Sequence, residues 1–194
     1  MSRSVALVVG SLRKKAFSRM VANALTELTP KSLVLEHVEI GELPLYNQDL
    51  DTEKRPAEEW VAFRDRVRGM DAVLFVTPEY NRSVPGVLKN AIDVGSRPYG
   101  HSVWSGKPAA IVSNSPGMYG AFGANHHLRQ SLVFLDMPAM QQPEAYLSQI
   151  NKSFDEDGKL TNDQTRDLLT KFMAAFEHWV ETHAAGAESA RRSA

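Results

Sequence analysis

The sequence of 194 residues predicts an α/β fold, a three-layer sandwich around a five-stranded parallel sheet in the strand order 2-1-3-4-5. Two continuous apolar runs, SVALVVG at 4–10 and DAVLFVT at 71–77, are typical of central parallel strands that are buried on both faces. Between strand-like segments, apolar residues recur at the spacing of helices. Strands that alternate with helices in this way indicate a parallel sheet with helices on both sides.

The first half of the chain accounts for three of the strands. LVLEHVEI at 33–40 alternates apolar and polar residues, as a strand does. Proline suits the first turn of a helix, so a helix is expected from about Pro85 to Gly95. The elements expected here are, in order, a strand at 4–10, a helix from Phe17 to Leu28, a strand at 33–40, a loop at 41–57, a helix that includes Trp60, Phe63 and Val67, a strand at 71–77 and the helix after Pro85.

The second half supplies the remaining two strands. PAAIVSNS at 108–115 predicts the fourth strand, and HLRQSLVFLDM at 127–137 predicts the helix after it. A short fifth strand is expected within 137–147. Thr161 and Gln164 have the spacing of a capping box, which predicts the start of the last helix. Its expected apolar face consists of Leu168, Leu169, Phe172, Phe176, Trp179 and Val180.

Charge and composition exclude several classes of protein. A net charge of −1 and a pI near 6.6 argue against a nucleic-acid partner and a polybasic membrane anchor. The chain has no cysteine, so a redox function needs a bound cofactor. No apolar run suits a secretory signal or approaches the roughly 20 residues of a membrane span. We therefore expect a cytoplasmic protein with one domain over residues 1–185 and a disordered tail at 186–194.

The first loop after a strand, GSLRKKAFS, has the residues of a phosphate site. A helix N-terminus offers free N–H groups, the hydroxyls of Ser11 and Ser18 add hydrogen bonds, and Arg13 can pair with a dianion. The same loop also fits a strand-to-helix turn with solvated basic residues. It matches neither G-x-G-x-x-G nor the P-loop pattern. Ligands of such sheets bind beyond the carboxyl ends of the strands, where the strand order reverses. The loops to consider are therefore 10–17, 78–84 and 115–123.

The second and third loops leave their role open. In TPEYNRSVPG, Pro78 and Asn81 form turns, and Tyr80 either caps the core or belongs to a backbone that aims amide groups at a flat heterocycle. The third loop, SNSPGMYGAFG, has small residues that let a ligand approach the backbone. It does not form a nucleophile elbow, because Ser113 stands where the first glycine belongs. Glu39 could imitate the ribose-binding acid of a dinucleotide fold, but without the glycines it is interpreted as a surface carboxylate.

Two segments together carry a family resemblance. GSLRKKAFS and PEYNRSVPGVLKNAID, in this strand context, resemble the NADPH-dependent FMN reductase family, a flavodoxin-like group that includes quinone and chromate reductases. The similarity extends from about Val5 to Leu147 and includes GKP at Gly106 and HLRQSLVFLDM at His127. The resemblance implies a flavodoxin-like fold with bound FMN.

The resemblance also implies which residues hold the cofactor. In the family the first loop holds the FMN phosphate, P-E-Y-N lies along the isoalloxazine mainly with its backbone, and the third loop approaches the ring or the ribityl chain. Ala16 departs from the family, because many relatives have serine there, so one hydroxyl contact is missing or replaced. Neither a catalytic side chain nor a metal is implied. The implied FMN-binding residues are Ser11, Arg13, Phe17, Ser18, Pro78, Glu79, Tyr80, Asn81, Ser115 and Gly117.

The activity implied by the resemblance is that of an NAD(P)H-dependent oxidoreductase. NADPH or NADH would pass a hydride to the flavin, and a small-molecule acceptor such as a quinone would then take two electrons in a ping-pong sequence. Chromate, azo compounds and free flavin are further acceptors of the group. The family forms homodimers and homotetramers, for which Val87 and Leu132 are candidate contacts, although core packing is the expected role of both.

Two other classes share this fold. A response-regulator receiver needs acidic residues after its first and third strands, where this chain has Gly10-Ser11 and Thr77-Pro78. An electron-carrier flavodoxin would bind FMN without oxidising nicotinamide. Such carriers are markedly acidic, whereas this chain is nearly neutral. The reductase is therefore the favoured interpretation, with the electron carrier as the alternative.

Overall fold

Five parallel strands form the central sheet of the residues that the structure describes. The structure, a computed structural model, describes residues 2–52 and 56–193, with side chains as far as residue 184. The strand order is β2-β1-β3-β4-β5, and every neighbouring pair is parallel, which confirms the predicted order. The strands are β1 (Arg3–Val9), β2 (Leu33–His37), β3 (Ala72–Thr77), β4 (Ala109–Asn114) and β5 (Ala145–Leu147).

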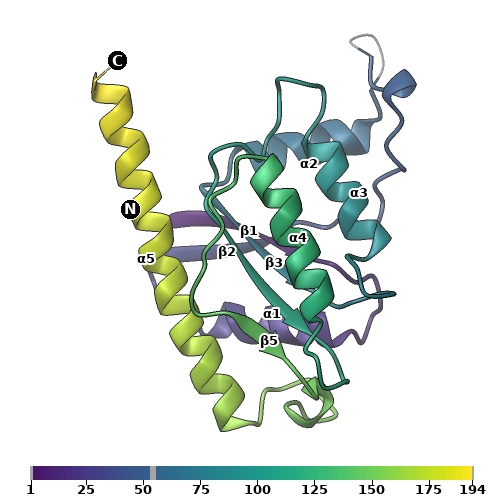
Figure 1. Cartoon of the computed structure of the whole chain (residues 1–194), viewed down its shortest axis with the longest axis vertical. Coiled ribbons are helices and arrows are strands. Elements are labelled where there is room, and N and C mark those ends of the chain that lie inside the picture. The colour runs from purple at the N-terminus through teal and green to yellow at the C-terminus, as the bar shows by residue number, and fades with distance from the viewer. Residues whose placement is uncertain (1, 53–55, 194) are drawn as a thin grey trace.

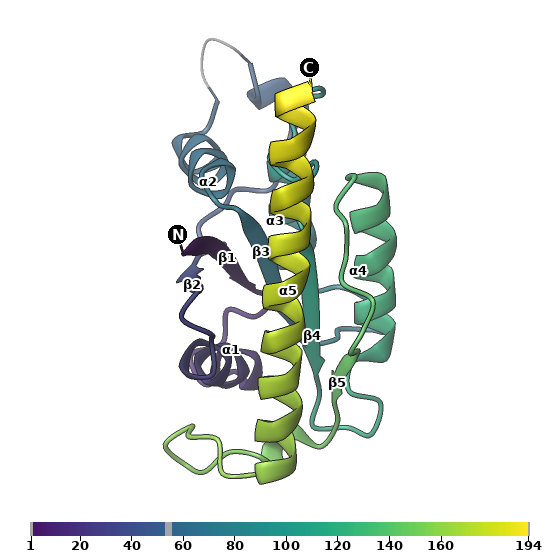
Figure 2. The same cartoon turned by 90° about the vertical axis from the view of Figure 1, so that its left-hand side faces the viewer.

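Helices cover both faces of this sheet, which completes the three layers. Figures 1 and 2 show α5 on one side of the sheet and α4 on the other. Buried side chains of α1 and α5 pack on one face, and those of α2, α3 and α4 pack on the other. The helices are α1 (Phe17–Glu27), α2 (Glu58–Arg68), α3 (Gly86–Gly95), α4 (Phe122–Phe134) and α5 (Asp163–Ser193).

The continuous apolar run of β1 follows from burial on both faces. Val5 and Leu7 point into the cluster under α1 and α5, whereas Ala6 and Val8 point into the cluster under α2, α3 and α4. Successive side chains of a strand point to opposite faces, so a strand that is covered twice needs apolar residues at every position. Burial of a large aliphatic or aromatic side chain contributes about 1.5–3 kcal/mol, so these two clusters hold the layers together.

Two helix starts differ from the sequence prediction. α4 begins at Phe122, five residues before the predicted start, because its first turn lies beside the third loop and does not show an apolar periodicity. α5 begins after Asn162, whose side-chain oxygen accepts a 2.8 Å hydrogen bond from the N–H of Thr165. The capping residue is therefore Asn162 and not Thr161, one position later than the capping box predicts.

The last helix reaches into the C-terminal segment. The backbone of α5 continues to Ser193, into the segment 186–194 for which we expect disorder. Ala and Arg, which make up five of the nine residues at 186–194, are strong helix formers. Residue 194, and residues 53–55 of the predicted loop 41–57, lie outside the described residues. Along the described part of the chain, no helix is both long and apolar enough to cross a membrane.

A buried ion pair anchors the long loop after β2. Arg64 of α2 donates two hydrogen bonds, of 2.9 and 2.7 Å, to the two carboxylate oxygens of Asp51. Its Nε donates to the carbonyl oxygen of Val94 at 2.9 Å. The side chains of Arg64 and Asp51 are only 6% and 3% exposed. Hydrogen bonds from the Arg64 guanidinium hold the pKa of Asp51 below its ordinary value.

Candidate cofactor site

The three predicted loops meet beyond the carboxyl ends of β1, β3 and β4. They enclose a cavity of about 290 Å³ at the point where the strand order reverses. Larger cavities lie elsewhere, such as one of about 480 Å³ beside Tyr46, so position and lining rather than size identify this site. The lining residues are Ser11, Arg13, Ala16, Phe17, Ser18, Pro78, Glu79, Tyr80, Asn114, Ser115 and Pro116.

The first loop presents donors at the start of α1. Ala16 occupies the N-cap position with extended backbone (φ −74°, ψ 135°), and its methyl group cannot cap the helix. Within residues 2–52 and 56–184, the N–H groups of Phe17 and Ser18 have no protein acceptor. The Arg13 side chain is exposed beside them. Free N–H groups, a guanidinium and the positive end of the helix dipole together suit a phosphate.

A buried amide connects the three loops at the base of the cavity. Asn114 is the last residue of β4. Its side-chain oxygen lies 3.2 Å, and its side-chain nitrogen 3.1 Å, from the hydroxyl oxygen of Ser18. Its Nδ2 also donates to the carbonyl oxygen of Thr77 at 3.4 Å. Ser18, Thr77 and Asn114 are all at most 2% exposed. Asn114 thus links α1 to the ends of β3 and β4.

The second loop turns tightly at its tip. Tyr80 and Ser83 exchange backbone hydrogen bonds of 3.1 and 3.0 Å, and the two residues between them have positive φ values, 51° at Asn81 and 64° at Arg82. This is the geometry of a type I′ turn, which non-glycine residues rarely adopt. The turn leaves Pro78 and Tyr80 along the wall of the cavity.

Glu79 belongs to the second loop but is hydrogen-bonded to α4. Its Oε2 accepts a 3.1 Å hydrogen bond from the N–H of Ala124, and its Oε1 lies 3.6 Å from the Arg82 guanidinium. The Arg82 guanidinium lies 5.2 Å from the ring centre of Tyr119 in the third loop. The Glu79 carboxylate therefore ties the second loop to the third and already has partners within the protein.

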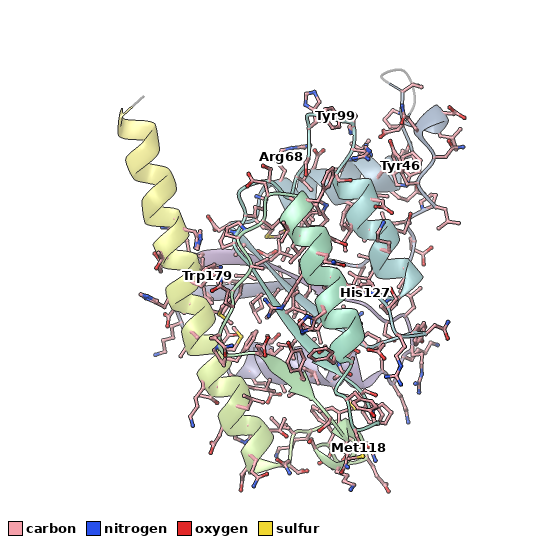
Figure 3. The ribbon with its side chains drawn as sticks, in the orientation of Figure 1. Tyr46, Arg68, Tyr99, Met118, His127 and Trp179 are labelled. Carbon is pink, nitrogen blue, oxygen red and sulfur yellow. The ribbon has the colours of Figure 1, made fainter. Side chains whose placement is uncertain are left out.

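Backbone hydrogen bonds fix the third loop to the segment after β5. The backbone N–H of Ser115 donates to the carbonyl oxygen of Leu147 at 3.0 Å. The backbone N–H of Gln149 donates to the carbonyl oxygen of Gly117, also at 3.0 Å. The Ser115 hydroxyl oxygen accepts from the N–H of Gly117 at 3.0 Å. Figure 3 shows Met118, the next residue, at the end of the molecule where this loop projects.

The cavity brings together most of the residues that the sequence predicts for it. Eight of the ten line it, whereas Asn81 lies in the exposed turn beside it and Gly117 lies farther along the third loop. Asn114 and Pro116 also line the cavity and are not among the residues that the sequence predicts. A polar residue at the carboxyl end of a buried strand was the available signal for Asn114.

Glu39, considered as a possible ribose-binding acid, is part of a surface ion pair. Its two carboxylate oxygens each accept a 3.0 Å hydrogen bond from Arg19. This hydrogen bonding lowers the pKa of Glu39, and burial lowers that of the neighbouring His37. The finding agrees with the interpretation of Glu39 as a surface carboxylate.

A doubly covered parallel sheet with this strand order and a phosphate-type loop at its reversal point defines a flavodoxin-like nucleotide-binding protein. The sequence profile of the NADPH-dependent FMN reductase family matches residues 3–152. The chain belongs to this family. It is therefore an enzyme that works with FMN and a nicotinamide donor.

Individual relatives cover nearly the whole chain. A quinone reductase of Pseudomonas putida is 64% identical over 94% of this chain and 97% of its own. An NAD(P)H-dependent FMN reductase of Pseudomonas aeruginosa is 42% identical over 89% of this chain and 92% of its own. The solved structure of FerB, an NAD(P)H:(acceptor) oxidoreductase from Paracoccus denitrificans, superposes with a TM-score of 0.87 at 41% identity and covers 93% of this chain and 98% of its own.

The described residues fit FMN. Free N–H groups at Phe17 and Ser18 and the exposed Arg13 suit the phosphate, and the cavity continues from them to the wall formed by Pro78 and Tyr80. Membership of a reductase family also disfavours the alternative of an electron carrier that does not oxidise nicotinamide.

Proposed function

We propose that the protein transfers two electrons from NADPH or NADH to quinones and similar small acceptors, in a ping-pong sequence. The observation that carries the proposal is the cavity at the strand reversal, with phosphate donors at one end and the second and third loops along its wall. FMN held in this cavity would supply the hydride-transfer chemistry that no side chain of the protein provides. The similarity to named quinone reductases favours quinones.

The proposed roles of the chain are binding and orientation. Arg13, Ser18 and the N–H of Phe17 hold the phosphate. The turn at Tyr80–Ser83 holds the backbone of Pro78–Asn81 along the ring, and Ser115 of the third loop also lines the cavity. Glu79 takes no proton in this scheme, because its carboxylate is engaged with Ala124 and Arg82.

The proposal includes a homodimer or homotetramer. Leu132 is fully buried and Val87 packs against the core, so the candidates named from the sequence are core residues. The neighbouring residues Val133 and Phe134, at the end of α4, are 78% and 80% exposed. Tyr99, in the loop that follows α3, is 88% exposed. Large exposed apolar side chains of this kind favour a contact between subunits. Light scattering behind size-exclusion chromatography measures the assembly directly.

The proposal further includes one domain over residues 1–185 and a cytoplasmic location, where reduced nicotinamide nucleotides are made. It also includes chromate, azo compounds and free flavin as secondary acceptors. Steady-state rates with each acceptor under one set of conditions rank them. A quinone is expected to have the highest kcat/KM of the series.

The test of the reaction is the visible absorption spectrum of the purified protein without oxygen. We expect a flavin spectrum that bleaches when NADPH is added and returns when a quinone is added afterwards. A flavin spectrum that both NADPH and NADH leave unchanged would indicate an electron carrier. A colourless protein that does not take up added FMN would refute the proposal.

A further inference from the structure

Asn114 is a buried polar residue of the cavity to which the proposed reaction gives no role. It lies at the end of β4 and is 2% exposed. Among the described residues, the hydrogen-bond partners of its side chain are the Ser18 hydroxyl and the carbonyl oxygen of Thr77. An amide that is buried at this edge of a sheet, beside a hydroxyl at a helix N-terminus, suits a role in ligand binding rather than in core packing.

Both polar atoms of the Asn114 side chain lie in hydrogen-bond range of the same Ser18 hydroxyl. The amide oxygen lies 3.2 Å and the amide nitrogen 3.1 Å from the same hydroxyl oxygen. A serine hydroxyl has one proton and two lone pairs, so it can donate to the amide oxygen or accept from the amide nitrogen. The carbonyl oxygen of Thr77 can only accept, which fixes the amide nitrogen on that side.

We propose that Asn114 is a positioning residue that keeps the Ser18 hydroxyl partnered while its proton turns toward the FMN phosphate. Without an anion, the hydroxyl donates to the amide oxygen of Asn114. With a phosphate in the cavity, the hydroxyl donates to the phosphate and accepts from the amide nitrogen instead. The Ser18 hydroxyl has a partner in either arrangement, and the amide nitrogen of Asn114 keeps the carbonyl oxygen of Thr77, so the hydroxyl turns toward the phosphate without becoming unpaired; the cost of the turn is the proton that the amide oxygen gives up. The inference rests on the proposed function, because it requires the phosphate to lie at the first loop.

The test compares the affinities for FMN and for riboflavin, which lacks the phosphate. In Asn114→Asp the carboxylate only accepts hydrogen bonds, so it holds the Ser18 proton away from the phosphate. We expect the ratio of FMN to riboflavin affinity, measured from flavin fluorescence, to fall by about 10- to 100-fold, the loss of one charge-assisted hydrogen bond. Asn125→Asp is the matched control, because Asn125 is also a buried amide bonded to a serine hydroxyl but does not line the cavity, and its ratio is expected to stay unchanged.

A double-mutant cycle separates positioning from simple charge repulsion. In a Ser18→Ala background, Asn114→Asp has no hydroxyl to hold, so we expect at most about a threefold further fall in the ratio. A full further fall in that background would overturn the inference, because the added charge alone would explain the effect. If Asn114→Asp does not fold, Asn114→Ala takes its place. We expect a fall of about threefold or more, and an unchanged ratio overturns the inference.

Arg13→Ala distinguishes this inference from the proposed function. If Arg13→Ala and Ser18→Ala lower the ratio but both Asn114 variants leave it unchanged, the phosphate site stands and the positioning role is wrong. If Arg13→Ala also leaves the ratio unchanged, the phosphate does not lie at the first loop, and both proposals fail.

Discussion

The carboxylate of Glu79 accepts a 3.1 Å hydrogen bond from the N–H of Ala124, in the first turn of α4. The N-cap residue of this helix is Ala121, whose methyl group cannot accept a hydrogen bond. Glu79 therefore caps α4 from a different loop, and its negative charge lies at the positive end of the helix dipole. A residue that the sequence predicts as a flavin contact thus has a structural role that couples two walls of the cavity.

The first prediction concerns the glycine under this contact. A Cβ at Gly123 would lie 2.8 Å from the carbonyl oxygen of Arg82 and 2.9 Å from the Glu79 carboxylate. Gly123→Ala should therefore lower the free energy of unfolding by about 1–3 kcal/mol, as overpacking does, and weaken FMN binding. Gly86→Ala is the control, because no atom lies within 4 Å of its added Cβ, and it should leave stability equal or higher. Equal urea midpoints for the two variants would contradict this prediction.

The second prediction separates capping by Glu79 from proton transfer. Glu79→Gln keeps an oxygen acceptor for Ala124, so quinone reductase kcat should stay within about threefold of the unmodified protein and show an unchanged pH profile. Glu79→Ala removes the acceptor and should lower the free energy of unfolding by about 0.5–2 kcal/mol, the usual range for a lost cap. A large fall in kcat for Glu79→Gln with normal stability would instead assign the proton chemistry to this carboxylate.

The sequence predicts the strands well because a strand that is buried on both faces needs an apolar residue at nearly every position. β1 and β3 are continuous apolar runs, and the loops after them necessarily meet at one edge of the sheet. The loops after β1, β3 and β4 bring to one cavity eight of the residues that the family resemblance implies. The starts of helices are harder to predict from the sequence. The first turn of α4, for example, is capped by Glu79 from another loop and not by its own N-cap residue.

The role of Asn114 could not be predicted because its partner is far away in the chain. Ser18 lies 96 positions earlier, and the contact exists only because α1 begins and β4 ends at the same edge of the sheet. In the sequence, Asn114 stands between two serines at the end of the predicted fourth strand, and no pattern there indicates its partner. Only the packed structure shows its burial and its two hydrogen-bonding atoms on one hydroxyl.

The third prediction addresses the phosphate end of the cavity. Arg13→Ala should raise the FMN dissociation constant by an amount equivalent to about 1–3 kcal/mol, because it removes a charge-assisted contact. Arg19→Ala is the matched control, because Arg19 lies in α1, six positions after Arg13, but is held by both carboxylate oxygens of Glu39. Titration of apoprotein with FMN measures both constants. Equal effects of the two variants would mean that Arg13 acts only through general positive charge.

The fourth prediction concerns Asp51 and the pH dependence of stability. Asp51→Ala leaves the Arg64 charge buried and unpaired, so the free energy of unfolding at about pH 7 should fall by about 3–5 kcal/mol. Because the folded-state pKa of Asp51 is lowered, its contribution is present above the ordinary value of 3.8 and is lost as pH falls through the lower folded value. The difference between variant and unmodified protein should therefore shrink below about pH 4.

An exposed ion pair provides the control for this measurement. Asp65 pairs with Arg68 on the surface of α2, where both side chains are more than half exposed. Asp65→Ala should cost less than about 1 kcal/mol. Denaturant unfolding at several pH values gives all three curves, and a constant difference for Asp51→Ala down to the lowest pH would show that its carboxylate is not what stabilises the loop.

The fifth prediction concerns Ala16, the uncapped start of α1. Ala16 is the N-cap of α1 and has the extended backbone that a capping serine adopts. Ala16→Ser should raise the free energy of unfolding of the apoprotein by about 0.5–2 kcal/mol and also tighten FMN binding, because the new hydroxyl lines the cavity. Ala57→Ser is the control. Ala57 is the N-cap of α2, equally without a capping side chain, and it lies away from the cavity, so this variant should gain stability without a change in FMN affinity. Tighter FMN binding in both variants would show that general stabilisation, and not a hydroxyl at the phosphate, is responsible.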